Sequence, residues 1–293
     1  MKIALISDIH ANVTALKAIL RDIKHQGADR ILSLGDQVNL GPCPRETLDL
    51  LSQEHVTCLI GNHERYVLEA MDGKSGYEGA NFDLVRFTAS QVTRNDLLLP
   101  ETAVLGPVLF CHALPGKDSF PVYDPDRVQK LLPDCSFGRY SHIVCGHGHN
   151  PTQITFNGIQ IDSIGSSGCM DAGIPGAAMY SMLWLYENGI TVIRPRFVTY
   201  DVHEVMRQFI QKGLFESCPI LSRIICQQMT DNLSVLVPFV ALASQLAKEA
   251  GESHITPEIF GRADEQFDWA DGLRSAEYWE KVLRDLRSCS IDV

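Results

Sequence analysis

Residues 2–12 read KIALISDIHAN, an apolar run that stops abruptly at a polar loop carrying Asp8 and His10. A short apolar run bounded by such a change predicts a strand buried on both faces, here Lys2–Ile6. Beyond the loop, the apolar side chains between Val13 and Ile23 recur at helical spacing. Strand, polar loop and helix in this order form the opening unit of a parallel α/β layer.

The same pattern continues as far as residue 64. We expect strands at Arg30–Leu34 and Val56–Ile60, with a helix at Thr47–Leu51 between them. Each strand again ends in a polar loop, Gly35-Asp36 after the second and Gly61-Asn62-His63-Glu64 after the third. Three strands joined by helices predict a parallel sheet whose carboxyl ends share one edge.

The pattern changes from Ala103, where short strands alternate with tight turns. Asn157-Gly158 and Asn188-Gly189 are strong hairpin signals and indicate a second, more antiparallel sheet. The strands expected there are Ala103–Leu105, Val108–Cys111, His142–Cys145, Gln153–Phe156, Ile159–Ile161, Ala178–Tyr186 and Ile190–Phe197. After Tyr200 the apolar spacing becomes helical. We therefore expect a sheet-containing catalytic domain over residues 1–200 and a helical C-terminal appendage over residues 201–293.

The composition is that of a folded protein with an acidic surface. Of 293 residues, 45% are hydrophobic and 21% are charged, and 25 basic against 36 acidic residues give a formal charge of −11. Such a surface repels nucleic acid and anionic lipid, so neither is expected as a partner. It also repels anionic substrates, and an enzyme of phosphate chemistry would need a local positive charge such as metal ions.

Cysteine usage and hydropathy favour a cytoplasmic protein. The nine cysteines are scattered without a CxxC pair, which is typical of a reducing compartment. The apolar start of the chain is too short for the core of a signal peptide. The longest apolar run lies within Leu233–Ala247, is interrupted by polar residues, and falls short of the roughly 20 residues that span a bilayer.

Residues able to bind metal follow almost every expected strand, and the fold would bring their loops to one edge of the sheets. The candidate ligands are Asp8, His10, Asp36, Asn62, His112, His147 and His149. Mixed carboxylate, amide and imidazole donors suit Mn, Fe, Zn, Co or Ni better than an oxygen-only cage for Ca or Mg. The set is too large for one tetrahedral zinc but suits two ions sharing a carboxylate, an arrangement that fits displacement at phosphorus.

Five sequence blocks together resemble a known family. They read SDIHAN from residue 7, GDQVNLGP from residue 35, GNHE from residue 61, His112, and GHGH from residue 146. In this order they resemble the calcineurin-like metallophosphoesterase superfamily, and the surrounding residues are most similar to its bacterial phosphodiesterase-like branch. The resemblance covers about residues 1–200. It implies a four-layer α/β/β/α sandwich of two mixed sheets and a hydrolase acting on phosphate ester bonds.

The resemblance also implies a role for each candidate ligand. One metal ion would be held by Asp8, His10, Asp36 and His149, and the other by Asp36, Asn62, His112 and His147, with Asp36 bridging. His63 would not ligate but would lie over the substrate, stabilise the phosphoryl group and protonate the leaving oxygen. A hydroxide held between the two divalent or trivalent ions would attack phosphorus in line. Manganese is among the metals that such a site accepts, and the sequence does not choose between them.

Several positions depart from the protein Ser/Thr phosphatases of this superfamily. Their block GDxVDRG reads GDQVNLG here, so Asn39 replaces an Asp that would orient and charge the catalytic His. Leu40 replaces an Arg that would clamp phosphate, and the block at Gly61 is not preceded by an Arg either. The absence of these arginine side chains argues against phosphoprotein monoesters as substrates. It favours a diester or an anhydride, which carries less charge per phosphorus.

Three residues are candidates for substrate binding: Asn12, Asn39 and Arg45. Asn12 could donate to a phosphate oxygen, or it could cap the helix that begins at Val13, and the two alternatives are equally open. Arg45 could replace the lost phosphate clamp, or it could be a solvated residue at the start of a helix.

These observations predict a dinuclear metal-dependent hydrolase of a small phosphodiester or a nucleotide phosphoanhydride. One alternative is a phosphoprotein Ser/Thr phosphatase or another phosphomonoesterase. A second is a non-catalytic scaffold on the same fold, which the presence of His63 and of every ligand disfavours. The expected partner is a small phosphorylated substrate such as a nucleotide. The sequence leaves the oligomeric state and the role of the C-terminal helices open.

Overall fold

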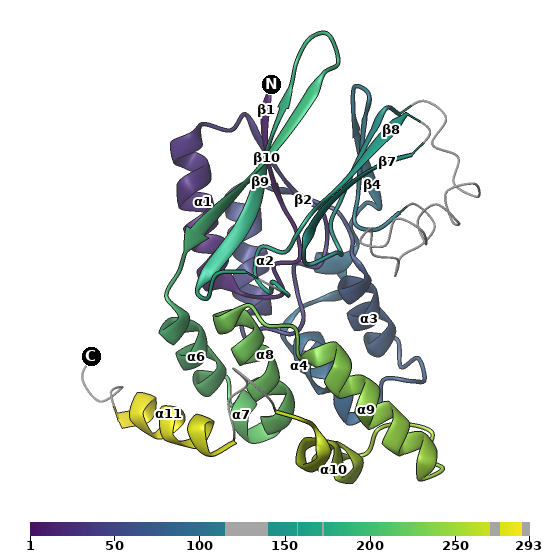
Figure 1. Ribbon diagram of the computed structural model, residues 1–293, viewed down its shortest axis with the longest axis vertical. Helices are drawn as coiled ribbons and strands as arrows, with labels where there is room; N and C mark the ends of the chain where they lie inside the picture. Colours follow the sequence, from purple (N-terminus) through teal and green to yellow (C-terminus); the bar gives the residue numbers. More distant parts are fainter. Residues whose placement is uncertain (115–139, 157, 172, 270–275, 289–293) are drawn as a thin grey trace.

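The computed structural model describes residues 1–114, 140–156, 158–171, 173–269 and 276–288. Two five-stranded mixed sheets face each other, and helices flank them (Figure 1). The strand order is β10-β9-β1-β2-β3 in the first sheet and β4-β5-β6-β8-β7 in the second. The expected sandwich of two mixed sheets with flanking helices is therefore confirmed.

The first sheet is parallel from β1 to β3 and antiparallel from β1 through β9 to β10. β1 pairs in parallel with β2, and β2 with β3, whereas β9 runs antiparallel to β1 and to β10. The strands are β1 (Lys2–Ile6), β2 (Arg30–Ser33), β3 (Thr57–Cys58), β9 (Ala177–Leu185) and β10 (Thr191–Thr199). β3 is shorter than expected from the apolar run, because only two of its residues pair with β2.

The second sheet has antiparallel edges around a parallel centre. β4 pairs antiparallel with β5, and β7 with β8, while β5, β6 and β8 are parallel. The strands are β4 (Thr102–Leu105), β5 (Val108–Cys111), β6 (His142–Cys145), β7 (Pro151–Phe156) and β8 (Ile159–Ile164). Phe156 pairs with Ile159, as expected for a hairpin, and Asn157 of the expected turn lies outside the described residues.

Alternation along β1 decides which apolar layer each side chain joins. Ile3 and Leu5 pack between the two sheets, against residues such as Phe110 of β5. Ala4 and Ile6 point to the opposite face, where they pack against the helix that follows β1. A strand that is apolar on both faces is thus covered on both faces, which is why Lys2–Ile6 has no polar alternation.

The helices of the first part of the chain follow the strands closely. They are α1 (Val13–Gln26), α2 (Pro44–Gln53), α3 (Asn62–Met71) and α4 (Asp83–Gln91), with 3-10 turns η1 (Ala80–Phe82) and η2 (Arg94–Leu97). α1 starts at the Asn12 cap and ends at Gly27, whose positive φ of 64° closes the helix. Both capping signals are readable in the sequence.

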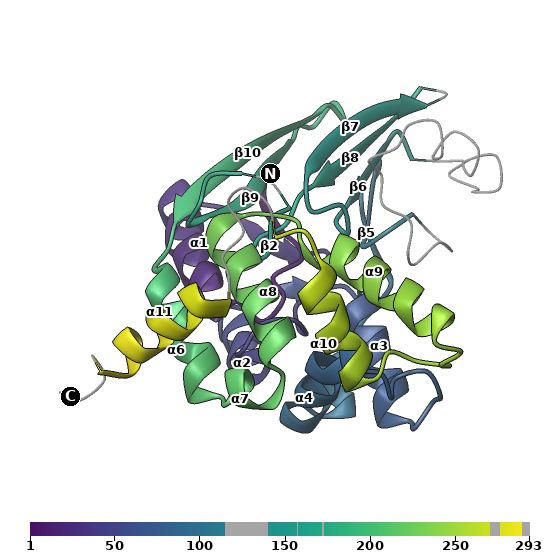
Figure 2. The same cartoon turned by 60° about the horizontal axis from the view of Figure 1, so that its bottom comes forward.

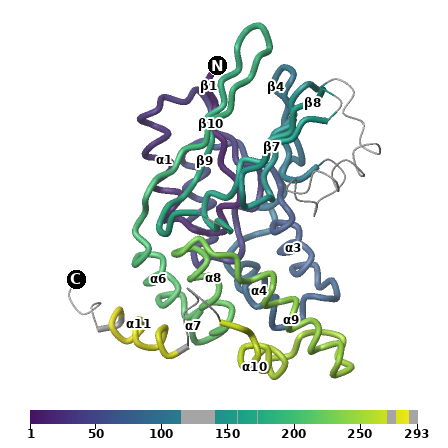
Figure 3. The backbone as a smooth tube through the Cα atoms, viewed as in Figure 1, coloured from purple at the N-terminus to yellow at the C-terminus, as the bar shows by residue number. Residues whose placement is uncertain are grey.

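The chain after residue 200 is helical, as expected. It forms α6 (Val202–Gln211), α7 (Leu214–Ser217), α8 (Pro219–Asp231), α9 (Leu236–Glu249), α10 (Pro257–Gln266) and α11 (Ala276–Ser288). These helices gather at one end of the sheets, near α4 (Figures 1 and 2). Figure 3 shows the same association as a tube, with the C-terminal part beside the segment that contains α4. None of the helices in the described ranges is long and apolar enough to cross a membrane.

The C-terminal helices share a core with the first part of the chain. Leu40 and Leu84 pack in one apolar cluster with residues of α6 to α10, including Phe209 and Phe239. Polar contacts reinforce the docking, since the backbone N–H of Ala80 donates to the carbonyl of Ile255 at 2.8 Å. The helices after residue 200 therefore pack against the sandwich along a continuous interior surface.

Candidate metal centre

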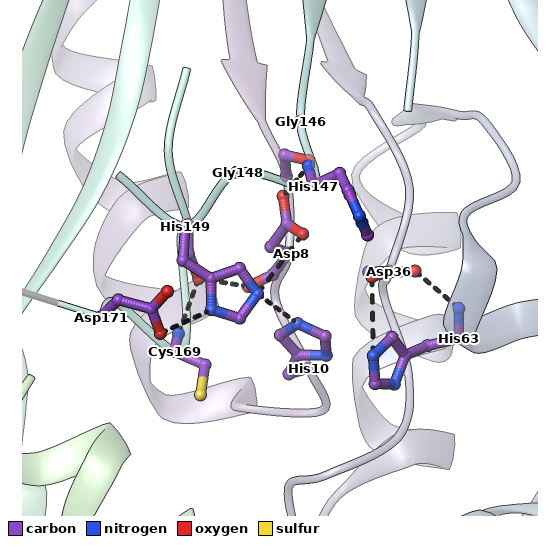
Figure 4. A network of polar contacts seen from close by, with 12 residues as sticks. Asp8, His10, Asp36, His63, Gly146, His147, Gly148, His149, Cys169 and Asp171 are labelled. Atoms are coloured by element: carbon purple, nitrogen blue, oxygen red, sulfur yellow. Dashed lines mark hydrogen bonds and ion pairs between the residues drawn. The ribbon is translucent and has the colours of Figure 1, made fainter. Parts of the chain in front are cut away.

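The polar loops that follow β1, β2, β3, β5 and β6 meet at one edge of the sandwich. Figure 4 shows residues of four of these loops, among them Asp8, Asp36 and His149. Ligand atoms lie within 4.8 Å of one another in three overlapping groups: Asp8, His10 and His149; His10, Asp36 and His63; Asp36, His112 and His147. The parallel pairings of β1 with β2 and of β5 with β6 bring these loops together. Residues up to 141 positions apart thus form a single cluster.

One half of the cluster is formed by Asp8, His10 and His149. The Nε2 atoms of His10 and His149 face each other at 3.1 Å, and His149 Nε2 lies 3.7 Å from Asp8 Oδ1. Asp8 is fully buried, and its Oδ1 makes no hydrogen bond within the described part of the chain. Its Oδ2 accepts the backbone N–H of His147 at 3.0 Å. A buried carboxylate oxygen without a donor, beside two ring nitrogens, suits a cation.

The other half contains Asp36, Asn62, His112 and His147. His112 Nε2 lies 2.8 Å from Asn62 Oδ1 and 3.2 Å from Asp36 Oδ2. The rings of His112 and His147 meet edge to face with centroids 5.1 Å apart. His112 Nδ1 lies 2.9 Å from the carbonyl oxygen of Leu34, which can only accept, so Nδ1 carries the proton. Nε2 is then left as the atom that faces the ligand cluster.

Asp36 lies between the two halves. Its Oδ2 lies 3.2 Å from His112 Nε2 and 3.9 Å from His63 Nε2, and its Oδ1 accepts the backbone N–H of His63 at 2.8 Å. The loop after β3 approaches so closely that a Cβ on Gly61 would lie 2.1 Å from Asp36 Oδ1. Glycine is therefore required at position 61 of the GNHE block, because any side chain would displace the carboxylate of Asp36.

The charges of the cluster suit a bound cation. Burial opposes the charge of Asp36, but His112 and His63 hold the pKa of that carboxyl well below its usual range. Burial lowers the pKa of His10 well below its ordinary value and that of His147 to about 4, so both rings are neutral near pH 7. Burial also opposes protonation of His112, but Asp36 raises its pKa to about 9. A cation bound there must displace that proton.

Four of the ligand residues have a left-handed backbone. The φ angles are 52° at Asp8, 50° at His10, 54° at Asp36 and 61° at His147. Such a conformation is unfavourable for residues other than glycine, and it persists where the surroundings fix it. Here the backbone N–H of Asp8 donates to Gly35 O and that of His10 to Asp36 O, both at 3.0 Å. Strain concentrated at these positions is typical of a functional site.

Glu64 organises the cluster, and sequence reasoning assigned it no role. Its Oε1 accepts the backbone N–H groups of Gln37 at 2.8 Å and Val38 at 3.1 Å. Its Oε2 accepts those of Asp36 at 2.9 Å and Gly61 at 2.8 Å. The side chain is fully buried, so one carboxylate joins the loops after β2 and β3. The only signal for this role in the sequence is its place at the end of the GNHE block.

His63 lies at the face of the cluster, oriented by Asn39. Asn39 Nδ2 lies 2.7 Å from His63 Nδ1, and the ring of His63 meets that of His10 edge to face at 4.7 Å. His63 Nε2 faces Asp36. Asn39 is 2% exposed, so its amide is a buried partner of the histidine ring. Asn39 thus contacts His63, and substrate binding by Asn39 stays a prediction.

Asn12 and Arg45 both contact other residues of the chain, and substrate binding by either stays a prediction. Asn12 Oδ1 accepts the N–H of Ala15 at 3.0 Å and its Nδ2 donates to Gly168 O at 2.9 Å, so it caps α1 and anchors a loop. Arg45 pairs with Asp96 and lies 3.3 Å from Asp49, which occupies its guanidinium with acidic neighbours. Asn12 therefore caps α1, and the guanidinium of Arg45 is paired with carboxylates.

Leu40, at the position of the missing arginine, has a packing role. It is 8% exposed and belongs to the apolar cluster formed with the C-terminal helices. A charged side chain at this position would be buried among apolar groups at a high cost in free energy. The C-terminal helices thus account for the absence of a cationic residue at position 40.

The Ser- and Gly-rich loop after β8 packs on the backbone of the first ligand loop. Ser166 Oγ donates to Asp8 O at 2.7 Å, and the backbone N–H of Ser167 donates to Ser7 O at 2.7 Å. A Cβ on Gly168 would lie 1.9 Å from Ile9 O. The loop therefore supports the strained backbone of Asp8 directly.

This combination of fold and site places the chain among the metallophosphoesterases. It belongs to the calcineurin-like phosphoesterase family, whose model matches residues 1–193. Proteins of this family bind divalent metals, and the carboxylate and imidazole groups described above can hold such an ion.

Individual relatives agree with this assignment. An uncharacterized protein of Methanocaldococcus jannaschii is 32% identical over 163 residues, which is 51% of this chain and 63% of that protein. The chain thus spans less than two thirds of that relative. A metallophosphoesterase from Sphaerobacter thermophilus is 25% identical with a TM-score of 0.60, covering 76% of this chain and 98% of its own.

A hypothetical protein from Pyrococcus horikoshii shares the fold. It is 15% identical with a TM-score of 0.61, covering 75% of this chain and 97% of its own. Both solved structures are matched almost completely, while a part of this chain lies outside each match.

Proposed function

We propose that this protein is a dinuclear metal-dependent hydrolase of small phosphodiesters or nucleotide phosphoanhydrides. The observation that carries the proposal is the position of Asp36 between two sets of ligands, with His10 on one side and His112 and His147 on the other. When bound, two metal ions would polarise phosphoryl oxygens and activate a water molecule. We take manganese as the first metal to test and the cytoplasm as the expected compartment.

The residues of the chain itself supply positioning and proton transfer. His63 Nε2 faces the cluster, at 3.9 Å from Asp36 Oδ2, and is the group placed to donate a proton to a leaving oxygen. Asn39 contacts the other ring nitrogen and holds the ring in this orientation. Because asparagine is neutral, it orients the imidazole without the charge that an aspartate would add.

The surroundings of the cluster favour a substrate of low charge. At position 40 the chain has a buried leucine in place of the arginine of phosphoprotein phosphatases, and Arg45 is paired with Asp96 and Asp49. A monoester dianion needs more cationic contacts than a diester or an internal anhydride phosphorus. This supports a diester or anhydride rather than a phosphoprotein.

The test is turnover of a substrate panel by metal-stripped protein with and without added manganese. The panel contains bis-p-nitrophenyl phosphate, p-nitrophenyl phosphate, a 2′,3′-cyclic nucleotide and a dinucleoside tetraphosphate. We expect metal-dependent turnover of a diester or anhydride that is lost in His63→Ala. His25→Ala removes an exposed histidine of α1 and is the matched control.

Other outcomes would change the proposal. Turnover of the monoester alone would move the protein to the phosphomonoesterases. No turnover of any panel member by manganese-loaded protein would favour the scaffold alternative.

A further inference from the structure

Asp171 connects the ligand cluster to the C-terminal helices. It lies in the loop after β8, and its Oδ1 is 3.3 Å from Nδ1 of His149 (Figure 4). The same oxygen accepts a hydrogen bond from Nε2 of Gln228 at 2.9 Å. Gln228 belongs to α8 and is 3% exposed. The carboxylate is therefore held between a residue of the ligand cluster and a buried amide of a helix after residue 200.

The contact to His149 has a specific chemical consequence. The contact is electrostatic, because Nδ1 of His149 makes no hydrogen bond within the described part of the chain. The negative charge of the carboxylate favours the tautomer of His149 that carries its proton on the nearby Nδ1. Nε2 is then unprotonated, and this is the atom that faces His10 at 3.1 Å and Asp8 at 3.7 Å. A carboxylate behind a ligand histidine fixes the direction of the ring and increases the basicity of the ligating nitrogen.

The end of α8 is built to hold the loop that carries Asp171. Asn232, with a φ of 54°, donates from Nδ2 to the carbonyls of Ile174 at 2.6 Å and Ala177 at 2.9 Å. The backbone N–H of Ser234 donates to Asp171 O at 3.1 Å. Asn232 is 2% exposed, so this junction is interior to the protein. Contacts from α8 and from the residues directly after it therefore act on the same loop.

The polar residues of this junction would lower the stability of the protein if they had no hydrogen-bond partners. Gln228 and Asn232 are buried next to the apolar cluster that contains Ile225 and Met229 of the same helix. Buried amides lower the stability of a protein unless they are hydrogen-bonded. The NH₂ groups of both residues donate to the Asp171 loop, whereas Oε1 of Gln228 has no partner within the described part of the chain. The hydrogen bonds of these buried amides therefore fix the position of this loop.

We propose that Asp171 is a positioning residue for His149, and that Gln228 of α8 holds it in place, so that the C-terminal helices complete one half of the metal centre. The inference rests on the proposed two-metal function. It extends that function to a part of the chain beyond residue 193, where the family match ends. The helices after residue 200 then determine metal affinity as well as packing.

The experiment measures binding of Mn(II) to metal-stripped full-length protein by competition with a chromophoric chelator, and the visible spectrum of Co(II)-loaded protein. The variants are Asp171→Ala, Asp171→Asn and Gln228→Ala. Gln227→Ala is the matched control, because Gln227 is the adjacent buried amide of α8 and its side chain contacts Asp231. Thermal melts monitored by circular dichroism identify variants that are not folded.

We expect Asp171→Ala to weaken one of two Mn(II) sites by about 10- to 100-fold and to change the Co(II) spectrum. Asp171→Asn, which keeps an accepting oxygen, should lose less affinity, and Gln228→Ala should weaken the same site by about tenfold. Gln227→Ala should match the wild type in both readouts. Wild-type affinity at both sites in folded Asp171→Ala would overturn the inference.

The two proposals can fail separately. If the wild type binds two ions and Asp171→Ala binds them equally well, the positioning role is wrong and the two-metal proposal stands. If the wild type binds a single ion, the two-metal proposal is wrong. In that case the affinity for the single Mn(II) ion tests the role of Asp171. Weaker binding by Asp171→Ala supports the positioning role, and unchanged binding overturns it.

Discussion

The carboxylate of Glu64 accepts the backbone N–H of Asp36 at 2.9 Å, and so fixes the backbone of the residue that lies between the two halves of the ligand cluster. Three further backbone N–H groups donate to the same carboxylate. The residue after His63 thus shapes the loop after β2. Burial raises the pKa of Glu64 to about 7, against the effect of these donors. A buried carboxyl group held by backbone N–H groups can support a strained loop without contributing a ligand.

Glu64→Gln should therefore lower the stability of the protein and its metal affinity, although it replaces none of the candidate ligands. The amide NH₂ would face backbone donors that it cannot satisfy, and we expect a loss of about 2–4 kcal/mol in the free energy of unfolding. Urea denaturation of the metal-free protein measures this loss. Metal affinity should fall in parallel, because the φ of 54° at Asp36 is no longer supported. A variant as stable as the wild type would contradict this account.

Asn39→Ala should separate orientation of His63 from metal binding. Asn39 contacts His63 Nδ1 at 2.7 Å. A positioned proton donor contributes about 10²- to 10⁴-fold to the rate, and this variant keeps the donor but loses its orienting partner. We therefore expect kcat to fall by about 10- to 100-fold, with KM and metal content unchanged. Steady-state kinetics on the best panel substrate and metal analysis test this. A rise in KM at constant kcat would instead indicate a substrate contact.

Metal binding should strengthen as the pH rises. Asp36 raises the pKa of His112 to about 9 in the metal-free cluster, so below that pH a proton must leave before a cation binds. For one released proton, the apparent affinity for Mn(II) should increase about tenfold per pH unit between pH 6 and pH 8 and level off above pH 9. Chelator competition at several pH values measures the slope, and a flat profile would exclude proton release.

Removal of the metal should lower thermal stability as well as activity. Ions that bind only the folded protein stabilise it by about 3 kcal/mol at a concentration one hundred times the dissociation constant. Metal-stripped protein should therefore melt at a lower temperature, and added manganese should restore both the melting temperature and turnover. Equal melting temperatures with and without manganese would argue against a bound ion.

Leu40→Arg should destabilise the protein rather than create a phosphate clamp. The side chain packs against the C-terminal helices, so a guanidinium there would be buried without a partner and cost about 3 kcal/mol or more. Leu40→Met, which conserves volume, should cost less than about 1.5 kcal/mol. Thermal melts compare the two variants. A stable Leu40→Arg protein with new activity on p-nitrophenyl phosphate would reverse the argument from position 40.

The ion pair of Arg45 and Asp96 should stabilise the folded protein at neutral pH, and this stabilisation should be lost at low pH. Burial opposes the charge of Asp96, but hydrogen bonds from Arg45 and Thr93 outweigh it and lower its pKa to about 2 from 3.8. The contribution is complete above pH 3.8 and is lost as the pH falls toward 2. Asp96→Asn should cost about 1 kcal/mol at pH 7 and less at pH 3 in urea titrations. Asp49→Asn, at the more exposed partner, should change little.

Local patterns predicted much of the fold and the identity of the cluster. Strand β1, the helix capped by Asn12, and the residues that gather around Asp36 all follow from apolar periodicity and from polar residues placed at strand ends. Parallel strands must bring their carboxyl ends to one edge, so a ligand after each strand is enough to predict one site. This prediction does not require the structure of the loops between the sequence blocks.

The sequence by itself determined two mixed sheets, a cluster rich in aspartate and histidine, and membership of a phosphoesterase family, because these depend on strand order and on residues at strand ends. Only the tertiary structure decided that Arg45 pairs with Asp96, that Leu40 packs under the C-terminal helices, and that Gln228 reaches Asp171. These contacts join segments far apart in the chain, and a side chain takes its partner from whatever the folded chain brings beside it. Local sequence patterns do not predict these contacts, because the pattern around Arg45, Leu40 or Gln228 is the same whichever residue each of them contacts in the folded protein.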